Sequence, residues 1–148
     1  MYIETVSVVT DELCLALQRL IPQLTARKAV PAWDELTTLI NSESSTVLIA
    51  RDPDEKGDIV GMLALVIYRV PTGLRSIVED VVVDESRRGH GIGKALMFHA
   101  IKLAREAGAS GVSLTSNPRR EAANKLYQSI GFKRRETNAY YLDLPPVS

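Results

Sequence analysis

Three glycines alternate with other residues in the run Arg88-Gly89-His90-Gly91-Ile92-Gly93-Lys94. Because glycine has no side chain, such a run can turn tightly and bring its backbone close to a ligand. A β-branched run at 77–83 precedes it and apolar residues at helical spacing follow it, so the glycines stand where a strand gives way to a helix. The first N–H groups of a helix have no partner within the helix, and the helix dipole adds positive charge there. The run therefore predicts a site for a phosphate group.

The spacing of the glycines excludes two common phosphate loops. A Walker A loop would need glycine at Arg88 and serine or threonine at Ala95. A dinucleotide fingerprint would need its third glycine at Lys94 or at Leu96. What remains is R-x-x-G-x-G, which by itself also allows a plain strand-to-helix turn.

This loop resembles the pyrophosphate loop of the GNAT superfamily of acyl-CoA N-acyltransferases. The segment 122–132, A-A-N-K-L-Y-Q-S-I-G-F, resembles the A-x-x-x-Y-x-x-x-G-F motif that follows the fifth strand of these enzymes. The resemblance extends over about residues 46–144. It implies an α/β (α+β) fold in one domain, residues 1–148. In this fold a mixed, mostly antiparallel sheet of six to seven strands, with a splayed central parallel pair, is flanked by about four helices.

The resemblance also implies acetyl-CoA as the cosubstrate, with no metal. In the family, backbone groups of the fourth strand pair with the pantetheine arm, and the loop amides take the pyrophosphate. In this chain the corresponding residues are Val81, Val82, Val83, Arg88, Gly89, His90, Gly91, Ile92, Gly93 and Lys94, and we add Asn117 and Asn124 near the second motif.

Two adjacent carboxylates, Glu79 and Asp80, interrupt the valine-rich strand. Burial would raise the pKa of such a carboxylate, which suits a general base. The strand I-V-E-D-V-V-V resembles that of glucosamine-phosphate acetyltransferases, in which the two acids meet the acceptor. Those enzymes carry a further acid where this chain has residues 115–117, Thr-Ser-Asn. The acceptor of those enzymes therefore cannot be assigned to this chain. We interpret Glu79 as a base acting through water and Asp80 as a contact of the acceptor or a loop, with a salt bridge to Arg75 as the structural alternative.

Two aromatic residues complete the predicted site. In the family, the tyrosine equivalent to Tyr127 protonates the leaving thiolate, although a tyrosine on this helix face would also suit the core. Trp33 lies in the region that lines the acceptor pocket of GNAT folds, and a core or lid tryptophan is the alternative.

These residues predict an N-acetyltransferase that moves an acetyl group to a primary amine by direct attack in a ternary complex. No cysteine or serine is positioned as a nucleophile, which favours direct attack. A small-molecule acceptor is favoured over a protein N-terminus or lysine. The competing class is a non-catalytic acyl-CoA sensor that pairs with a partner protein.

Hydrophobic periodicity predicts the elements that must position these residues. Residues 58–68 are apolar on both faces, which indicates a central strand. We expect a first helix with its cap at 10–12 and apolar residues at helical spacing from 13 to 24, and a polar connection at 25–31. We also expect strands at 2–9, 45–51, 58–68, 74–83 and 111–115, helices at 33–40, 91–107 and 120–130, and a closing hairpin at 132–135 and 138–144.

Composition limits the partners and the compartment. Lysine and arginine number 18, as do aspartate and glutamate, and this balance argues against non-specific nucleic-acid binding. The single cysteine, Cys14, excludes an internal disulfide and favours a reducing compartment. Without an apolar run of membrane-spanning length or a signal-peptide pattern, we expect a cytoplasmic protein with no membrane partner. The apolar stretch 140–144 makes a homodimer edge possible.

Overall fold

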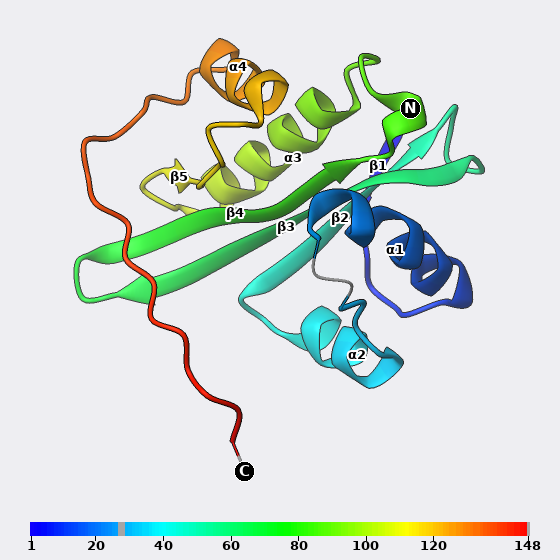
Figure 1. Ribbon diagram of the computed structural model, residues 1–148, viewed down its shortest axis with the longest axis horizontal. Coiled ribbons are helices and arrows are strands. Elements are labelled where there is room, and N and C mark those ends of the chain that lie inside the picture. The colour runs from blue at the N-terminus through cyan, green and yellow to red at the C-terminus, as the bar shows by residue number, and fades with distance from the viewer. Residues whose placement is uncertain (27–28, 148) are drawn as a thin grey trace. The chain divides into compact units, whose positions relative to one another are not determined.

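The computed structural model describes residues 1–26 and 29–147, and a five-stranded sheet organises its first 115 residues (Figure 1). The strands follow one another across the sheet in chain order, and all neighbours are antiparallel except the parallel pair β4 and β5. β3 is the central strand, as its apolar faces predict. The strands are β1 (Tyr2–Thr5), β2 (Ser45–Asp52), β3 (Asp58–Val70), β4 (Gly73–Val83) and β5 (Val112–Ser113).

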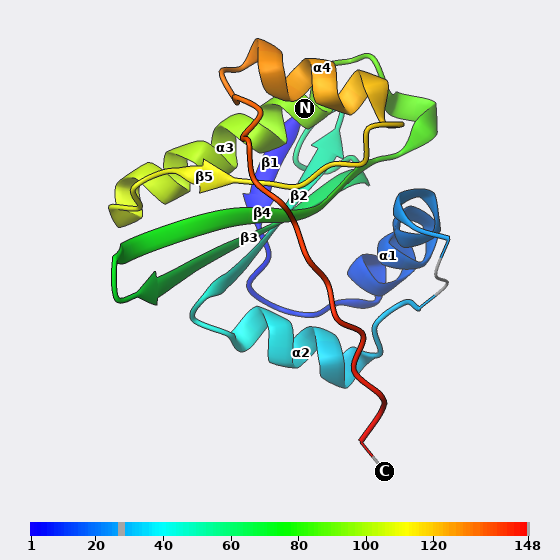
Figure 2. The ribbon, with the colours of Figure 1, turned by 60° about the vertical axis from the view of Figure 1, so that its left-hand side comes forward.

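Helices cover both faces of this sheet. α1 (Asp11–Leu24) and α2 (Trp33–Asn41) lie on one face, and α3 (Ile92–Ala107) lies on the other (Figure 2). α1 begins after Thr10, whose Oγ1 accepts a hydrogen bond from the Leu13 amide at 3.1 Å. This side chain satisfies one of the four amides that a helix start leaves without a partner.

The face under α1 and α2 forms one apolar cluster. Leu13, Leu17 and Leu20 of α1 project into it at helical spacing, and Leu20 is fully buried. The sheet contributes Ile49, Ile59, Met62 and Val82, and α2 contributes Leu36. Since α1 rests on β3 and β4 in this cluster, its outer side chains come within reach of the segment that follows β4.

On the opposite face, Gly61 of β3 sets the distance of α3. A Cβ at Gly61 would lie 3.3 Å from both Ile92 Cγ2 and Leu96 Cδ1, so glycine lets the helix pack closely on the strand. Ile92, Leu96 and Met97 are each at most 2% exposed. The start of α3, where Ile92 stands, is thereby fixed against the centre of the sheet.

Residues 116–147 form the second part of the structure and contain α4 (Glu121–Ser129). The predicted hairpin at 132–144 is wrong, because these residues form no strand, so the described chain has five strands rather than six to seven. The sequence of a segment indicates which faces it would have as a strand. It does not show whether a neighbouring strand is present to pair with its backbone N–H and C=O groups. The organisation as one domain stays a prediction, because the chain divides into two compact units at 115/116.

Smaller differences concern element ends. β1 ends at Thr5 rather than at residue 9, and β5 contains only Val112 and Ser113 of the predicted 111–115. The predicted connection 25–31 includes residues 27 and 28, which lie outside the described residues. Within 1–26 and 29–147 no helix is long and apolar enough to cross a membrane, and no group of three or more His, Cys, Asp or Glu side chains is placed to hold a metal ion.

Candidate active site

β4 carries a bulge in the middle of the predicted site. Met62 of β3 pairs with Val82, but Ala64 pairs with Glu79, so β4 holds one residue more than β3 over this stretch. Asp80 lies within the bulge and has a φ of 49°, in the left-handed region that residues other than glycine rarely adopt. Aspartate tolerates this region better than most residues do. Such a bulge bends a strand and re-aims the residues beyond it, here Val81 to Val83.

Both carboxylates beside the bulge are exposed to solvent. The prediction that Glu79 and Asp80 are buried is therefore wrong. Burial was inferred from the valine-rich composition of the strand, and composition does not show the extra residue of the bulge. Neither carboxylate forms an ion pair within the described residues, and the Arg75 guanidinium donates to Thr72 Oγ1 at 2.8 Å instead.

The valines after the bulge end the strand beside a short parallel partner. Val82 is 3% exposed and belongs to the α1 cluster, whereas Val81 and Val83 are half-buried. Pairing between β4 and β5 covers only Ser76 and Ile77, opposite Val112 and Ser113. The two parallel strands thus pair only in the first half of β4, which agrees with the predicted splay. The predicted central place of this pair is wrong, because β5 is the edge strand of the described sheet.

The glycine loop opens directly onto α3. Gly89 and Gly91 have φ values of 82° and 80°, and a Cβ built on either would meet no protein atom within 4 Å. Gly91 caps α3 and has no side chain, so the cap residue makes no side-chain hydrogen bond to the first amides of this helix, at Ile92, Gly93 and Lys94. Left-handed glycines, open space and uncapped amides together fit a diphosphate.

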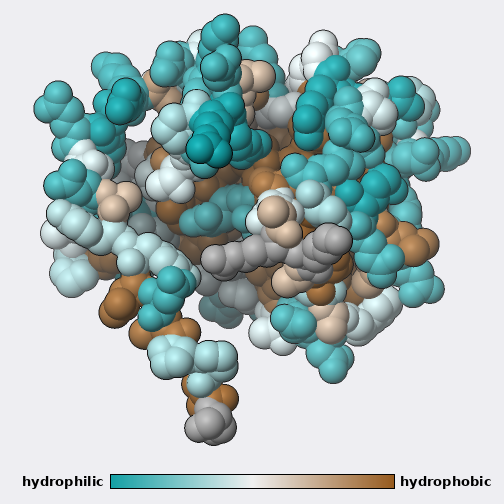
Figure 3. Space-filling view, in the orientation of Figure 1, coloured by the Kyte–Doolittle hydropathy of each residue, from teal (hydrophilic) through white to brown (hydrophobic). Residues whose placement is uncertain are grey.

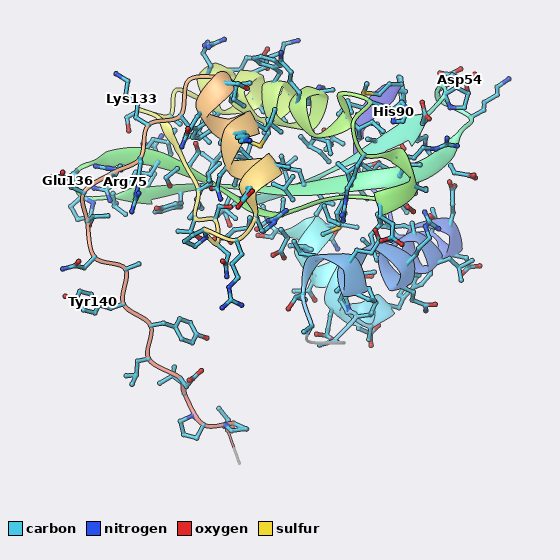
Figure 4. The ribbon with its side chains drawn as sticks, turned by 45° about the horizontal axis from the view of Figure 1, so that its top comes forward. Asp54, Arg75, His90, Lys133, Glu136 and Tyr140 are labelled. Atoms are coloured by element: carbon cyan, nitrogen blue, oxygen red, sulfur yellow. The ribbon has the colours of Figure 1, made fainter. Side chains whose placement is uncertain are left out.

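Three charged or titratable side chains border the loop, and all are exposed. The Arg88 Nε donates to the Val83 carbonyl at 3.1 Å, which folds the loop back on the end of β4. The His90 Nδ1 lies 3.2 Å and 3.0 Å from the Arg87 and Arg88 carbonyl oxygens, so this ring braces the loop backbone (Figure 4). Lys94 Nζ lies 5.8 Å from the centroid of the Phe98 ring.

The segment just before the glycine loop is held by side chains that the sequence analysis did not identify. Asp84, only 8% exposed, accepts hydrogen bonds from Ser86 and from Arg19 of α1. The pKa of the Asp84 carboxyl is lowered below its ordinary value, mainly by the hydrogen bond from the Ser86 amide. Burial acts in the opposite direction, and Arg19 lowers the pKa further. An aspartate two residues before a serine is a local turn signal, but nothing local points to Arg19, 65 residues away.

The second part of the structure contains the predicted acid. Tyr127 of α4 is 6% exposed, and its ring meets the Phe132 ring edge-on with the centroids 6.1 Å apart. Burial raises the pKa of the Tyr127 phenol, and the positive charge of Arg120 offsets part of this rise. The phenol therefore carries its proton at neutral pH, as a general acid must.

Asn124 of α4 reaches back to Asn117, which precedes the helix. The Asn124 Nδ2 donates to the carbonyl oxygens of Asn117 and Arg120, both at 2.9 Å. Asn117 Oδ1 in turn accepts from the Arg119 amide at 2.9 Å. The Asn124 amide nitrogen is thus committed to the protein, and a ligand would meet its oxygen.

Trp33 is the first residue of α2 and is 47% exposed. This exposure excludes the alternative of a core tryptophan.

A model of the Acetyltransferase (GNAT) family matches residues 15–132. The chain belongs to the GNAT family. The matched range begins within α1 and ends at Phe132, so it includes both motifs and every residue of the candidate site described above.

Relatives of this GNAT chain carry several acceptor names. It is 39% identical over 83 residues to a glucosamine 6-phosphate N-acetyltransferase of Trypanosoma brucei brucei, covering 54% of each protein. It is 34% identical over 90 residues to a mycothiol acetyltransferase of Renibacterium salmoninarum, covering 60% of this chain and 27% of that protein. The matches thus span about half or less of these two relatives.

Solved structures share the fold over nearly the whole chain. A Trypanosoma brucei acetyltransferase superposes with a TM-score of 0.75 at 28% identity, over 97% of this chain and 99% of the other. An aminoglycoside acetyltransferase from an uncultured soil metagenomic sample, in complex with sisomicin, superposes with a TM-score of 0.82 over 97% and 96% of the two chains. The second structure is only 21% identical in sequence, so it supports the fold alone.

Proposed function

We propose that the chain is an N-acetyltransferase that moves the acetyl group of acetyl-CoA to a primary amine on a small molecule, by direct attack in a ternary complex. The observation that carries the proposal is the open glycine loop at the start of α3, directly after the bulged strand. The relatives named for glucosamine 6-phosphate and mycothiol support a small-molecule acceptor.

Acetyl-CoA would be held by backbone more than by side chains. The amides from Gly89 to Lys94 would take the diphosphate, and the backbone of Val81 to Val83 would pair with the pantetheine arm as an added strand. Asn124 would contribute its Oδ1, because its Nδ2 already donates twice within the protein, and Asn117 would stand beside it. The positive side chains of Arg88 and Lys94 would add charge near the phosphates.

The chemistry needs one group that takes a proton and one that returns a proton. The acceptor nitrogen attacks the thioester carbonyl carbon, and Glu79 takes the amine proton through a water, which suits an exposed carboxylate. Collapse of the tetrahedral species breaks the C–S bond, and the departing thiolate takes the proton of the Tyr127 phenol. Asp80 and Trp33 would contact the acceptor.

Thiol release from acetyl-CoA in the presence of a panel of amines tests this function. The panel holds hexosamine phosphates, an aminoglycoside, and peptides with a free N-terminus or lysine, with product masses confirming N-acetylation. We expect release with small-molecule amines. Release with peptides alone would assign the chain to protein acetylation, and binding of acetyl-CoA without release would replace the enzyme by a sensor.

Replacing Glu79 with glutamine is expected to lower turnover most near neutral pH and less at alkaline pH. At alkaline pH the acceptor amine loses its proton without help, so the missing base matters less. Steady-state rates of the Glu79→Gln and Asp80→Asn variants from about pH 7 to 9.5 check this expectation. An equal loss at every pH for Glu79→Gln, with the graded loss in Asp80→Asn, would transfer the role of base to Asp80.

We propose further that two copies of the chain associate through the C-terminal segment 138–147. Tyr140, Tyr141, Leu142 and Leu144 are each at least 80% exposed, and Figure 3 shows hydrophobic residues among those of the C-terminal tail. Runs of exposed apolar side chains mark interaction sites. Sedimentation of the wild-type chain at micromolar concentration should give a dimer and Leu142→Asp a monomer. A monomeric wild-type chain would refute the association.

A further inference from the structure

Two side chains of α1, Arg19 and Gln23, hold the start of the segment that leads from β4 to the glycine loop; we call this pair the α1 clamp. The Arg19 Nε donates to Asp84 Oδ2 at 3.0 Å. The Gln23 Oε1 accepts from the Glu85 amide at 2.8 Å. The clamp residues are one helical turn apart, and Gln23 Nε2 donates to the Arg19 carbonyl at 3.1 Å, which steadies the pair.

Asp84 connects the clamp to both the sheet and the loop. Its amide donates to the Val60 carbonyl of β3 at 2.8 Å, and its Oδ1 accepts from the Ser86 amide at 3.0 Å and the Ser86 hydroxyl at 2.8 Å. The Arg87 amide donates to the Asp84 carbonyl at 2.8 Å, which closes the short 3-10 helix η1 (Glu85–Arg87). Since the carboxylate is nearly buried, these bonds have little competition from water.

The second arm of Arg19 fixes α1 on the sheet. Its Nη2 donates to the Ile59 carbonyl of β3, so one guanidinium bridges β3 and the residue that follows β4. Arg87 adds a longer ion pair on the far side of η1, with its Nε 3.5 Å from Asp52 Oδ2. The direction in which the chain leaves β4 is therefore set by side chains from α1 and β2.

We propose that Arg19 and Gln23 are positioning residues for acetyl-CoA: by fixing Asp84 and Glu85 they aim the amides of Gly89 to Lys94 at the diphosphate. The inference rests on the proposed function. A loop with glycines at 89 and 91 has many backbone conformations, and ordering it on binding costs entropy. If the start of the loop is already fixed before CoA binds, less entropy is lost on binding. The clamp therefore contributes to affinity without touching the ligand.

Two variants remove the polar groups of the clamp and leave an unbranched apolar side chain in their place. Arg19→Met deletes the guanidinium, and Gln23→Met deletes the acceptor for the Glu85 amide without changing charge. Thr10→Ala is the matched control, because it weakens the same helix at its first turn, away from the loop. The measurements are the Kd of CoA by calorimetry, kcat and KM for acetyl-CoA, and the melting temperature.

We expect each clamp variant to raise the Kd of CoA and the KM for acetyl-CoA about fivefold, the worth of roughly one hydrogen bond. The kcat at saturating acetyl-CoA should stay within about twofold, since the bound loop reaches the same geometry. Thr10→Ala should lower the melting temperature and leave the Kd unchanged.

Two failures are distinguishable. If wild-type protein does not bind CoA, the proposed function fails and the inference falls with it. If wild-type protein binds CoA and both clamp variants bind it as tightly, with only a lower melting temperature as in Thr10→Ala, the clamp is structural and the inference alone is overturned. A Gln23→Met variant that folds normally decides the question even if Arg19→Met does not fold.

Discussion

Replacing Tyr127 with phenylalanine is expected to lower kcat by roughly 10²- to 10⁴-fold, the usual contribution of one general acid. The change removes one proton donor and almost no volume, and the edge-on contact with Phe132 needs only the ring. CoA affinity and the melting temperature should therefore hold. Burial keeps the phenol protonated above its ordinary pKa of 10.0, so the wild-type rate should not fall on the alkaline side before about pH 10.

The exposed Tyr140 supplies a matched control, since Tyr140→Phe makes the same chemical change at a side chain that is 88% exposed. Its kcat should equal that of the wild type. If Tyr127 serves only the core, Tyr127→Phe costs at most about 1 kcal/mol of stability, and kcat stays within a few-fold. That outcome would leave the thiolate to depart unaided or through water.

Local pattern was enough to predict the sheet and its helices. Residues 45–51, 58–68 and 74–83 are apolar runs separated by turn signals, and the structure forms β2, β3 and β4 there. The glycines at 91 and 108 marked both ends of α3, because a helix start with open amides and a left-handed helix end each favour glycine. The loop motif and its flanking elements were therefore predictable together.

Tertiary features had no local signal. A valine-rich run has the same composition whether or not the strand contains a bulge. The bulge at Asp80 and the exposure of Glu79 were therefore not predictable from it. The contacts of Arg19 with Asp84 and of Gln23 with Glu85 join residues more than 60 positions apart. The segment 138–144 has strand composition, but a strand also requires a partner edge, and within the described residues it has none.

Placing valine at Gly91 is expected to raise the Kd of CoA at least tenfold, or about 1.4 kcal/mol. The reason is that the new side chain would fill space that no protein atom occupies and that the proposed diphosphate needs. Valine also strains the backbone, because φ is 80° at this position. Calorimetric titration with CoA and thermal melting measure the two effects separately.

A valine at Gly108 is the control that separates backbone strain from the loss of space for the ligand. Gly108 caps the other end of α3 with a φ of 86°, and a Cβ there also meets nothing within 4 Å. Gly108→Val should therefore lower the melting temperature by an amount similar to that of Gly91→Val while leaving the Kd of CoA unchanged. Equal Kd values in the two variants would mean that the space above Gly91 holds no ligand, and the loop would then be a plain strand-to-helix turn.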